Sequence, residues 1–71
     1  MKLGQIVIVK NVASSNDSTT QPAIVTCAWD ENMVNVMILP DCGVPYCHTS
    51  MRREGVASPG EPCFTDVNDS V

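Results

Sequence analysis

Soft metal ligands are gathered in the second half of the chain. Cys42 and Cys47 lie five positions apart, His48 follows at once, and Cys63 comes fifteen positions after the histidine. Thiolates and imidazole are ligands that Zn²⁺ prefers, and four of them complete a tetrahedral site. If residues 46–51 form a strand, however, Cys47 and His48 project to opposite faces, and one ion could not easily reach both. We therefore expect no metal and interpret the cysteines as core or half-buried thiols.

The same thiols and the single histidine bear on nucleophilic catalysis. A catalytic cysteine needs a histidine and an orienting carboxylate or amide within reach. Cys27, Cys42 or Cys63 could approach His48 in the folded chain, but nothing in the spacing requires it. The sequence also has no glycine-rich phosphate loop and no paired acids at a catalytic spacing. We expect a protein that is not an enzyme and has no cofactor.

Arg52 and Arg53 form the only basic cluster. Tyr46 and His48 precede them on the same segment, and Asn35 is an isolated polar residue in an apolar strand. Guanidinium groups bind phosphates and aromatic rings stack on bases, so these five residues are a candidate ligand pocket for a nucleotide. In the alternative interpretation, the arginines are solvated and pair with the acidic residues that follow them.

A β-hairpin over residues 21–39 is the element that positions these groups. With a two-residue loop at Glu31-Asn32, one side of the ribbon is apolar along its length. Such a ribbon must be covered by another sheet or by a closed barrel. Because the chain has one Trp, one Tyr and one Phe, Trp29 is the expected centre of the core. The cross-strand pairs on the apolar side are Trp29 with Val34, Cys27 with Val36 and Val25 with Ile38.

The opposite side of this ribbon is also partly apolar. Met33, Met37 and Leu39 share it with Ile24. This is more apolar surface than a monomer is expected to expose, so we interpret these methionines and Leu39 as an interface and expect a homo-oligomer. The alternative is that barrel curvature buries this side under the 13–20 loop and the tail.

The remaining segments complete a small all-β domain. Residues 5–10 read as a β-branched strand, 14–20 as a polar surface loop and 40–45 as a turn. Residues 46–51 alternate, with Tyr46, His48 and Ser50 on one face. We predict a barrel over residues 1–55 and an irregular acidic tail over 56–71 that is partly packed on the barrel and frayed from residue 65.

The net charge of −4 lies in the last quarter of the chain. Acids and bases cancel over residues 1–53, whereas residues 54–71 carry four unopposed acids, namely Glu54, Glu61, Asp66 and Asp69. We therefore do not expect nucleic-acid binding; the tail would be a solvating segment or would pair with a basic partner. The apolar run 5–9 is too short for a signal peptide, and no run is long enough to cross a bilayer, so we expect a cytoplasmic protein without membrane contact.

The order of these motifs resembles small proteins that are common in tailed-phage and prophage genomes. The resemblance covers about residues 3–50, and Pro59-Gly60-Glu61-Pro62-Cys63-Phe64 is a loose counterpart of the Pro-Gly-Thr-Trp-like end of such proteins, with Phe64 in place of tryptophan. It implies a small SH3-like five-stranded barrel with a long first loop. The matching residues are Gly4, Val7, Pro22, Ala23, Ile24, Val25, Thr26, Trp29, Val34, Asn35, Val36, Asp41, Gly43, Thr49 and Ser50.

A phage origin also suggests a role. We expect a non-enzymatic accessory protein that acts on a host component in the host cytoplasm. In its sharpest form it would sequester a nucleotide immune signal in a pocket between subunits, lined by Tyr46, His48, Arg52, Arg53 and Asn35. The alternatives are a protein–protein inhibitor that uses the apolar side or the acidic tail, and a structural accessory of the virion.

Overall fold

The computed structural model describes residues 2–12, 20–40 and 43–67, and these form an all-β closed barrel. Each strand pairs with the next, and β5 returns to β1; all neighbours are antiparallel except β4 and β5, which are parallel. The all-β five-stranded barrel that the sequence predicts is therefore confirmed. No helix in the described part of the chain is long and apolar enough to cross a membrane. The strands are β1 (Ile6–Lys10), β2 (Thr20–Asp30), β3 (Met33–Ile38), β4 (Tyr46–Arg53) and β5 (Cys63–Asp66).

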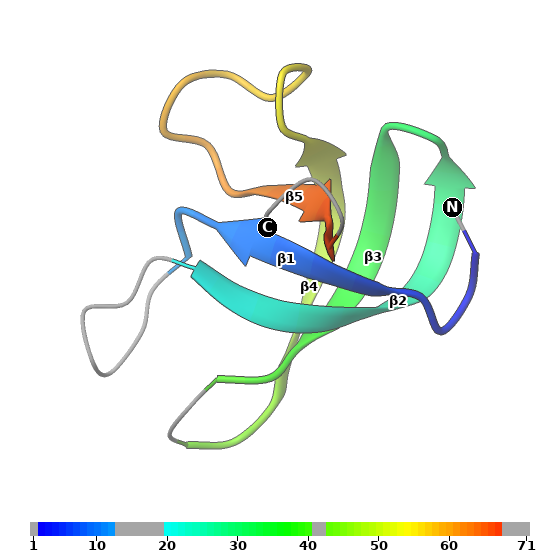
Figure 1. The fold of residues 1–71 in the computed structure, drawn as a ribbon, viewed down its shortest axis with the longest axis vertical. Coiled ribbons are helices and arrows are strands. Elements are labelled where there is room, and N and C mark those ends of the chain that lie inside the picture. Colours follow the sequence, from blue (N-terminus) through cyan, green and yellow to red (C-terminus); the bar gives the residue numbers. More distant parts are fainter. Residues whose placement is uncertain (1, 13–19, 41–42, 68–71) are drawn as a thin grey trace.

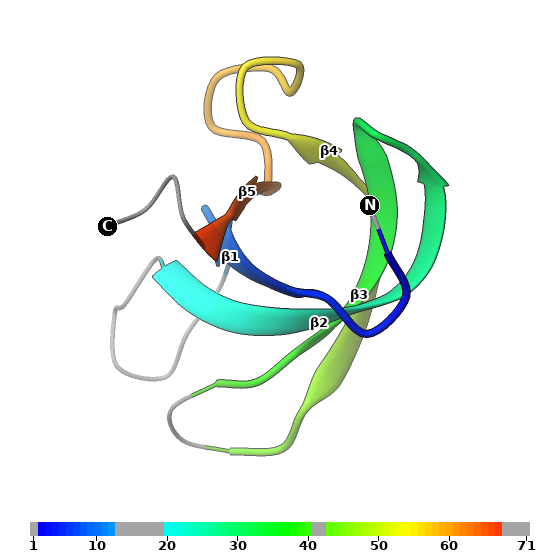
Figure 2. The ribbon, with the colours of Figure 1, turned by 45° about the vertical axis from the view of Figure 1, so that its right-hand side comes forward.

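The last strand comes from the segment expected to be an irregular tail. Figures 1 and 2 show β5 between β1 and β4, where it closes the barrel. Lys10 pairs with Cys63 and Val9 with Phe64. Residues 56–71 are thus not a separate tail, since four of them belong to the barrel wall. The end of the predicted tail, residues 68–71, lies outside the described residues, as do loop residues 14–19 and Asp41-Cys42 in the predicted turn.

Phe64, and not Trp29, is the largest side chain at the centre of the core. Phe64 is fully buried, whereas Trp29 is 61% exposed, so the expectation for Trp29 was wrong. Inward-facing residues of the other four strands surround Phe64. They are Val7, Val9, Ala23, Val25, Val34, Val36, Ile38 and Met51.

Two β-bulges in β2 explain the exposure of Trp29. The loop at Glu31-Asn32 is confirmed, because Asp30 pairs with Met33 across it. Beyond the loop, however, Ala28 pairs with Val34 and Val25 with Val36, so the predicted pairs are wrong. Trp29 and Thr26 are the extra residues at the two register shifts, and each extra residue changes which side chains face the core. Cys27 accordingly lies opposite Asn35 and is half-buried.

A third bulge lies in β4. His48 pairs with Val36 and Met51 with Val34, so three steps along β4 match two along β3. Ser50 takes a positive φ of 56° at this bulge. As a result His48 and Met51 share the inner side of the barrel, and the predicted alternation fails beyond His48. Cys47 pairs with Met37 on the outer side, so the expected separation of Cys47 from His48 is confirmed.

Candidate functional site

Arg53 fastens the β2–β3 hairpin to the last strand. Its Nε donates a hydrogen bond to the Glu31 carbonyl oxygen at 3.0 Å, and its Nη1 lies 3.3 Å from Asp66 Oδ2. The guanidinium also lies over the Phe64 ring, 4.9 Å from the centroid. Only 23% of the side-chain surface is exposed. Arg53 therefore has two of its guanidinium nitrogens and its flat face engaged within the barrel, and its role here is structural.

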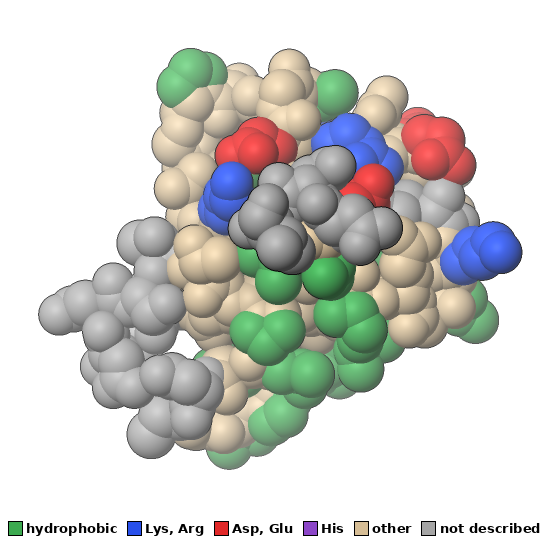
Figure 3. Space-filling model, in the orientation of Figure 1, with side chains coloured by type: hydrophobic (Ala, Val, Ile, Leu, Met, Phe, Trp, Pro, Cys, Tyr) green, Lys and Arg blue, Asp and Glu red, His purple; other side chains and the backbone are tan. Residues whose placement is uncertain are grey.

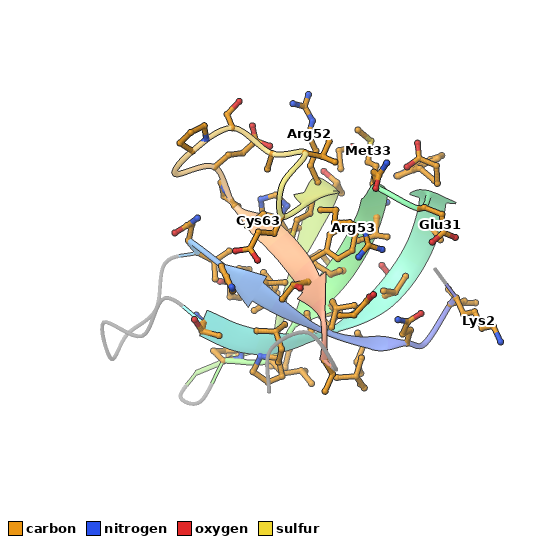
Figure 4. All side chains as sticks on the ribbon, turned by 45° about the horizontal axis from the view of Figure 1, so that its top comes forward. Lys2, Glu31, Met33, Arg52, Arg53 and Cys63 are labelled. Carbon is orange, nitrogen blue, oxygen red and sulfur yellow. The ribbon has the colours of Figure 1, made fainter. Side chains whose placement is uncertain are left out.

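Arg52 projects to the other side of β4. Consecutive strand residues point to opposite faces, and Figure 4 shows Arg52 directed away from Arg53. Its Nη1 lies 3.9 Å from Glu61 Oε1, and Lys10 Nζ lies 2.9 Å from Glu54 Oε2. With the Arg53–Asp66 pair, three of the four acids counted in residues 54–71 face cations of the barrel. This agrees with the interpretation in which the arginines pair with the acidic segment; Asp69 lies outside the described residues.

Asn35 holds two bulges together with one oxygen. Its Oδ1 accepts a hydrogen bond from Trp29 Nε1 at 2.9 Å and another from the Ser50 backbone N–H at 2.8 Å. Trp29 is the bulge residue of β2, and Ser50 carries the positive φ in the bulge of β4. Asn35 thus links three neighbouring strands on the outer side of the barrel. Sequence reasoning singled out Asn35 as a polar residue in an apolar strand but did not find these partners.

The two aromatic residues of the predicted ligand pocket lie elsewhere on β4. Tyr46 begins the strand opposite Ile38 and is 38% exposed. His48 lies on the inner side, and its Nδ1 is buried without a hydrogen-bond partner among the described residues. His48 faces inward while Arg52 and Asn35 face outward, so the five predicted ligand residues do not converge on one point of the barrel. A pocket between subunits stays a prediction.

The described cysteines do not form a metal centre. Outside residues 1, 13–19, 41–42 and 68–71, no group of three or more His, Cys, Asp or Glu side chains is placed to hold a metal ion. Cys42 is one of the residues not described, Cys47 is exposed on the outer side and Cys63 is buried. Burial raises the pKa of the Cys63 thiol above its ordinary value of 9.0; Glu54 adds to the rise and Lys10 opposes it. The buried thiol is therefore protonated and a poor nucleophile at neutral pH.

A pocket of about 290 Å³ lies beside Cys63. The turn after β4 forms most of its wall, and Asn11 closes one side by donating from Nδ2 to the Glu61 carbonyl oxygen at 3.2 Å. The only carboxylate of the lining is Glu54, which is paired with Lys10. The lining thus offers chiefly turn backbone and small side chains.

An apolar row crosses the outer side of four strands. Ile6 pairs with Ile24, Ile24 with Met37, and Met37 with Cys47, so one residue of each strand from β1 to β4 stands at the same level. We call these four residues the outer row. The predicted interface residues lie on this side too: Met33 and Met37 alternate with buried residues of β3, and the N–H of Leu39 donates to the Pro22 carbonyl oxygen at 2.9 Å. Met33, Met37 and Leu39 are each half-buried.

Comparisons with known proteins found no counterpart. No family model, no curated protein and no solved structure matches the chain. Its function must therefore be inferred from its own surfaces.

Proposed function

We propose that this chain is a non-enzymatic binding module of phage origin that acts on a host protein by direct contact. The outer row is the observation that carries the proposal, since it places four apolar side chains side by side without a charge between them. The phage origin, the SH3-like kinship and the location in the host cytoplasm rest on the resemblance of the sequence motifs. A host protein with an apolar surface of matching shape is the proposed occupant.

The outer row has the properties of a contact surface. Ile6 is 46% exposed and Cys47 is exposed, while Ile24 and Met37 are half-buried. Ile8 and Pro22, which pair with each other, extend the apolar surface. Figure 3 shows the largest group of hydrophobic side chains in the centre and lower part of this face, with most of the acidic and basic side chains above it. Contiguous apolar surface of this kind marks interaction sites, and methionine adapts to irregular partners.

The charges of the chain favour this surface over the acidic segment. Glu54, Glu61 and Asp66 already face Lys10 and the two arginines, so these carboxylates do not form an unopposed strip for a basic target. Removal of residues 56–71 would also delete β5 and both of its seams, and a loss of function would then report unfolding. Single substitutions are the sharper tool.

The test places a charge in the middle of the outer row. Met37→Glu is compared with Val56→Glu, because Val56 is 51% exposed in the turn after β4 and lies outside the row. Host proteins captured by the wild-type chain are purified and their affinities measured by calorimetry. We expect Met37→Glu to weaken binding of the purified partner at least about tenfold, or about 1.4 kcal/mol, and Val56→Glu to leave it unchanged.

Native mass spectrometry of the protein from its expressing host completes the test. A bare chain that gains a purified host protein at fixed stoichiometry supports the proposal. A bound mass of a few hundred daltons would instead support nucleotide sequestration between subunits. A dimer dispersed by Met37→Glu would assign the outer row to a second copy, and equal partner affinities of the two variants would likewise overturn the proposal.

A further inference from the structure

Trp29 is held by a side-chain hydrogen bond although most of the residue faces solvent. It is the extra residue of a bulge, the residue is 61% exposed, and its Nε1–H donates to Asn35 Oδ1 at 2.9 Å. The same oxygen fixes Ser50, whose positive φ is a conformation that non-glycine residues rarely adopt. With its only donor occupied, the indole offers its flat face. The bulge, the Asn35 amide and the strained Ser50 together hold the indole of Trp29 in solvent. The stability of the hairpin does not require an apolar ring in that position.

Asp30 is the next residue along β2 and lies on the same side of the sheet as Asn35, to which Trp29 is hydrogen-bonded. Asp30 pairs with Met33, and Met33 alternates with the buried Val34, so both Asp30 and Met33 lie on the outer side. Asp30 Oδ1 accepts a hydrogen bond from the Asn32 backbone N–H at 2.7 Å, which fixes the carboxylate at the end of the strand. Trp29, Asp30, Met33 and Asn35 thus form one surface, which we call the hairpin corner.

The charges near the hairpin corner indicate which kind of ligand could bind there. Lys10, Arg52 and Arg53 face Glu54, Glu61 and Asp66, so these cations do not neutralise Asp30. Arg52 pairs in register with Met33 and extends toward Glu61, and Arg53 donates to the Glu31 carbonyl oxygen at the hairpin loop. A nucleic acid would bring phosphates toward Asp30 and a chain of net charge −4, which disfavours base stacking on Trp29.

We propose that the hairpin corner binds an arginine side chain of the protein partner, with the guanidinium over the face of Trp29 and paired with Asp30. The inference rests on the proposed function and names the chemistry of the contact. A guanidinium stacks on indole through cation–π attraction and donates to a carboxylate in the same plane. Exposed, pre-organised tryptophans are also the side chains that dominate interface energies.

The single tryptophan makes this corner directly observable. The folded full chain is titrated with an acetylated, amidated Gly-Arg-Gly-Arg-Gly peptide, and the indole N–H signal and Trp29 fluorescence are followed. A second peptide carries citrulline, which has the shape of arginine without its charge. We expect a saturable shift of the indole signal by the arginine peptide, and binding about three- to tenfold weaker for citrulline.

Two carboxylate variants locate the contact. Asp30→Asn should weaken binding of the arginine peptide about threefold. Glu54→Gln removes a carboxylate outside the corner and should leave that binding unchanged. Equal shifts by the two peptides, or shifts confined to residues other than Trp29 and Asp30, would overturn the arginine site. Met37→Glu should leave peptide binding at the corner unchanged. A negative peptide titration would therefore contradict only the arginine site, whereas an unchanged affinity of Met37→Glu for the host protein would contradict the outer row as the contact surface.

Discussion

The Arg53 guanidinium lies 4.9 Å from the centre of the Phe64 ring, and the same group reaches both Glu31 and Asp66. Arg53 thereby connects the tip of the β2–β3 hairpin to the strand that closes the barrel. In this structure Arg53, whose type suggested phosphate binding, links parts of the chain that are distant in sequence. Its neighbour Arg52 makes only a long ion pair at the surface.

Arg53→Ala should therefore destabilise the barrel far more than Arg52→Ala. We expect a loss of about 2 kcal/mol for Arg53, from the cation–π contact and the hydrogen bonds to Glu31 and Asp66, discounted for partial exposure. Arg52→Ala should cost less than about 0.5 kcal/mol. Urea unfolding measures both, and similar losses in the two variants would contradict the structural role of Arg53.

Phe64 and Trp29 provide a second comparison, because Phe64 occupies the core position expected for Trp29. Phe64→Ala should cost about 3–5 kcal/mol, because it empties the centre of the core, and a domain of 71 residues has little reserve against that loss. Trp29→Phe should cost about 1 kcal/mol or less, since it removes one hydrogen bond at an exposed ring. Amide NMR spectra give the result: lost dispersion for the first variant and retained dispersion for the second. The reverse order would place Trp29 in the core.

Position 50 should accommodate glycine better than the native serine. A φ of 56° strains serine but not glycine, and the hydrogen bond from the Ser50 N–H to Asn35 does not need the hydroxyl. Ser50→Gly should stabilise the barrel by about 1 kcal/mol, or raise Tm by about 4–8 °C. Asn11→Gly is the comparison: Asn11 also has a positive φ, of 62°, but its side chain bonds Glu61. That change should bring no gain, because asparagine tolerates this conformation.

Cys63 and Cys47 should differ in reactivity. Exposed Cys47 should react with a maleimide at about pH 7, whereas buried Cys63, whose pKa is raised, should react only after unfolding. Peptide mapping by mass spectrometry reads out both sites. Rapid labelling of Cys63 in the folded chain would show that the β1–β5 seam opens readily.

The same thiol makes stability fall at high pH. The folded chain keeps the Cys63 proton at a pH where the unfolded chain has lost it, because the folded pKa lies above the ordinary 9.0. The contribution is complete below about pH 9 and declines as pH rises toward the folded pKa. Urea unfolding from about pH 8 to about pH 10.5 should show a steeper decline for the wild type than for Cys63→Ala. Parallel curves would refute the linkage.

The hairpin loop and the barrel class could be predicted because both depend on local patterns. Glu31-Asn32 between two alternating runs identifies the turn, and one apolar side demands closure. The bulges could not, since Trp29 and Thr26 look like ordinary members of the alternation. Asn35 Oδ1 accepts hydrogen bonds at one bulge of β2 and at the bulge of β4, and these contacts form only when β2, β3 and β4 are side by side.

β5 was missed for a different reason. Its four residues are too few to show a period, and its partner β1 lies more than fifty positions earlier, as the Lys10–Cys63 pair shows. The contacts of the two arginines could not be predicted for the same reason. Whether Arg52 and Arg53 face a ligand or a carboxylate depends on Glu61 and Asp66, whose positions follow from that strand.

The position of β5 also governs when the protein can fold during synthesis. β1 must wait until residues 63–66 are made before its second neighbour exists, and β4 joins β5 by only two residue pairs. Closure therefore pairs strands that lie more than fifty positions apart, and such non-local pairing is slow. A nascent or prematurely terminated chain would expose the free edge of β1, with its run Ile-Val-Ile-Val, to any other unpaired strand nearby. Closure of the barrel during synthesis thus depends on residues 63–66 being translated.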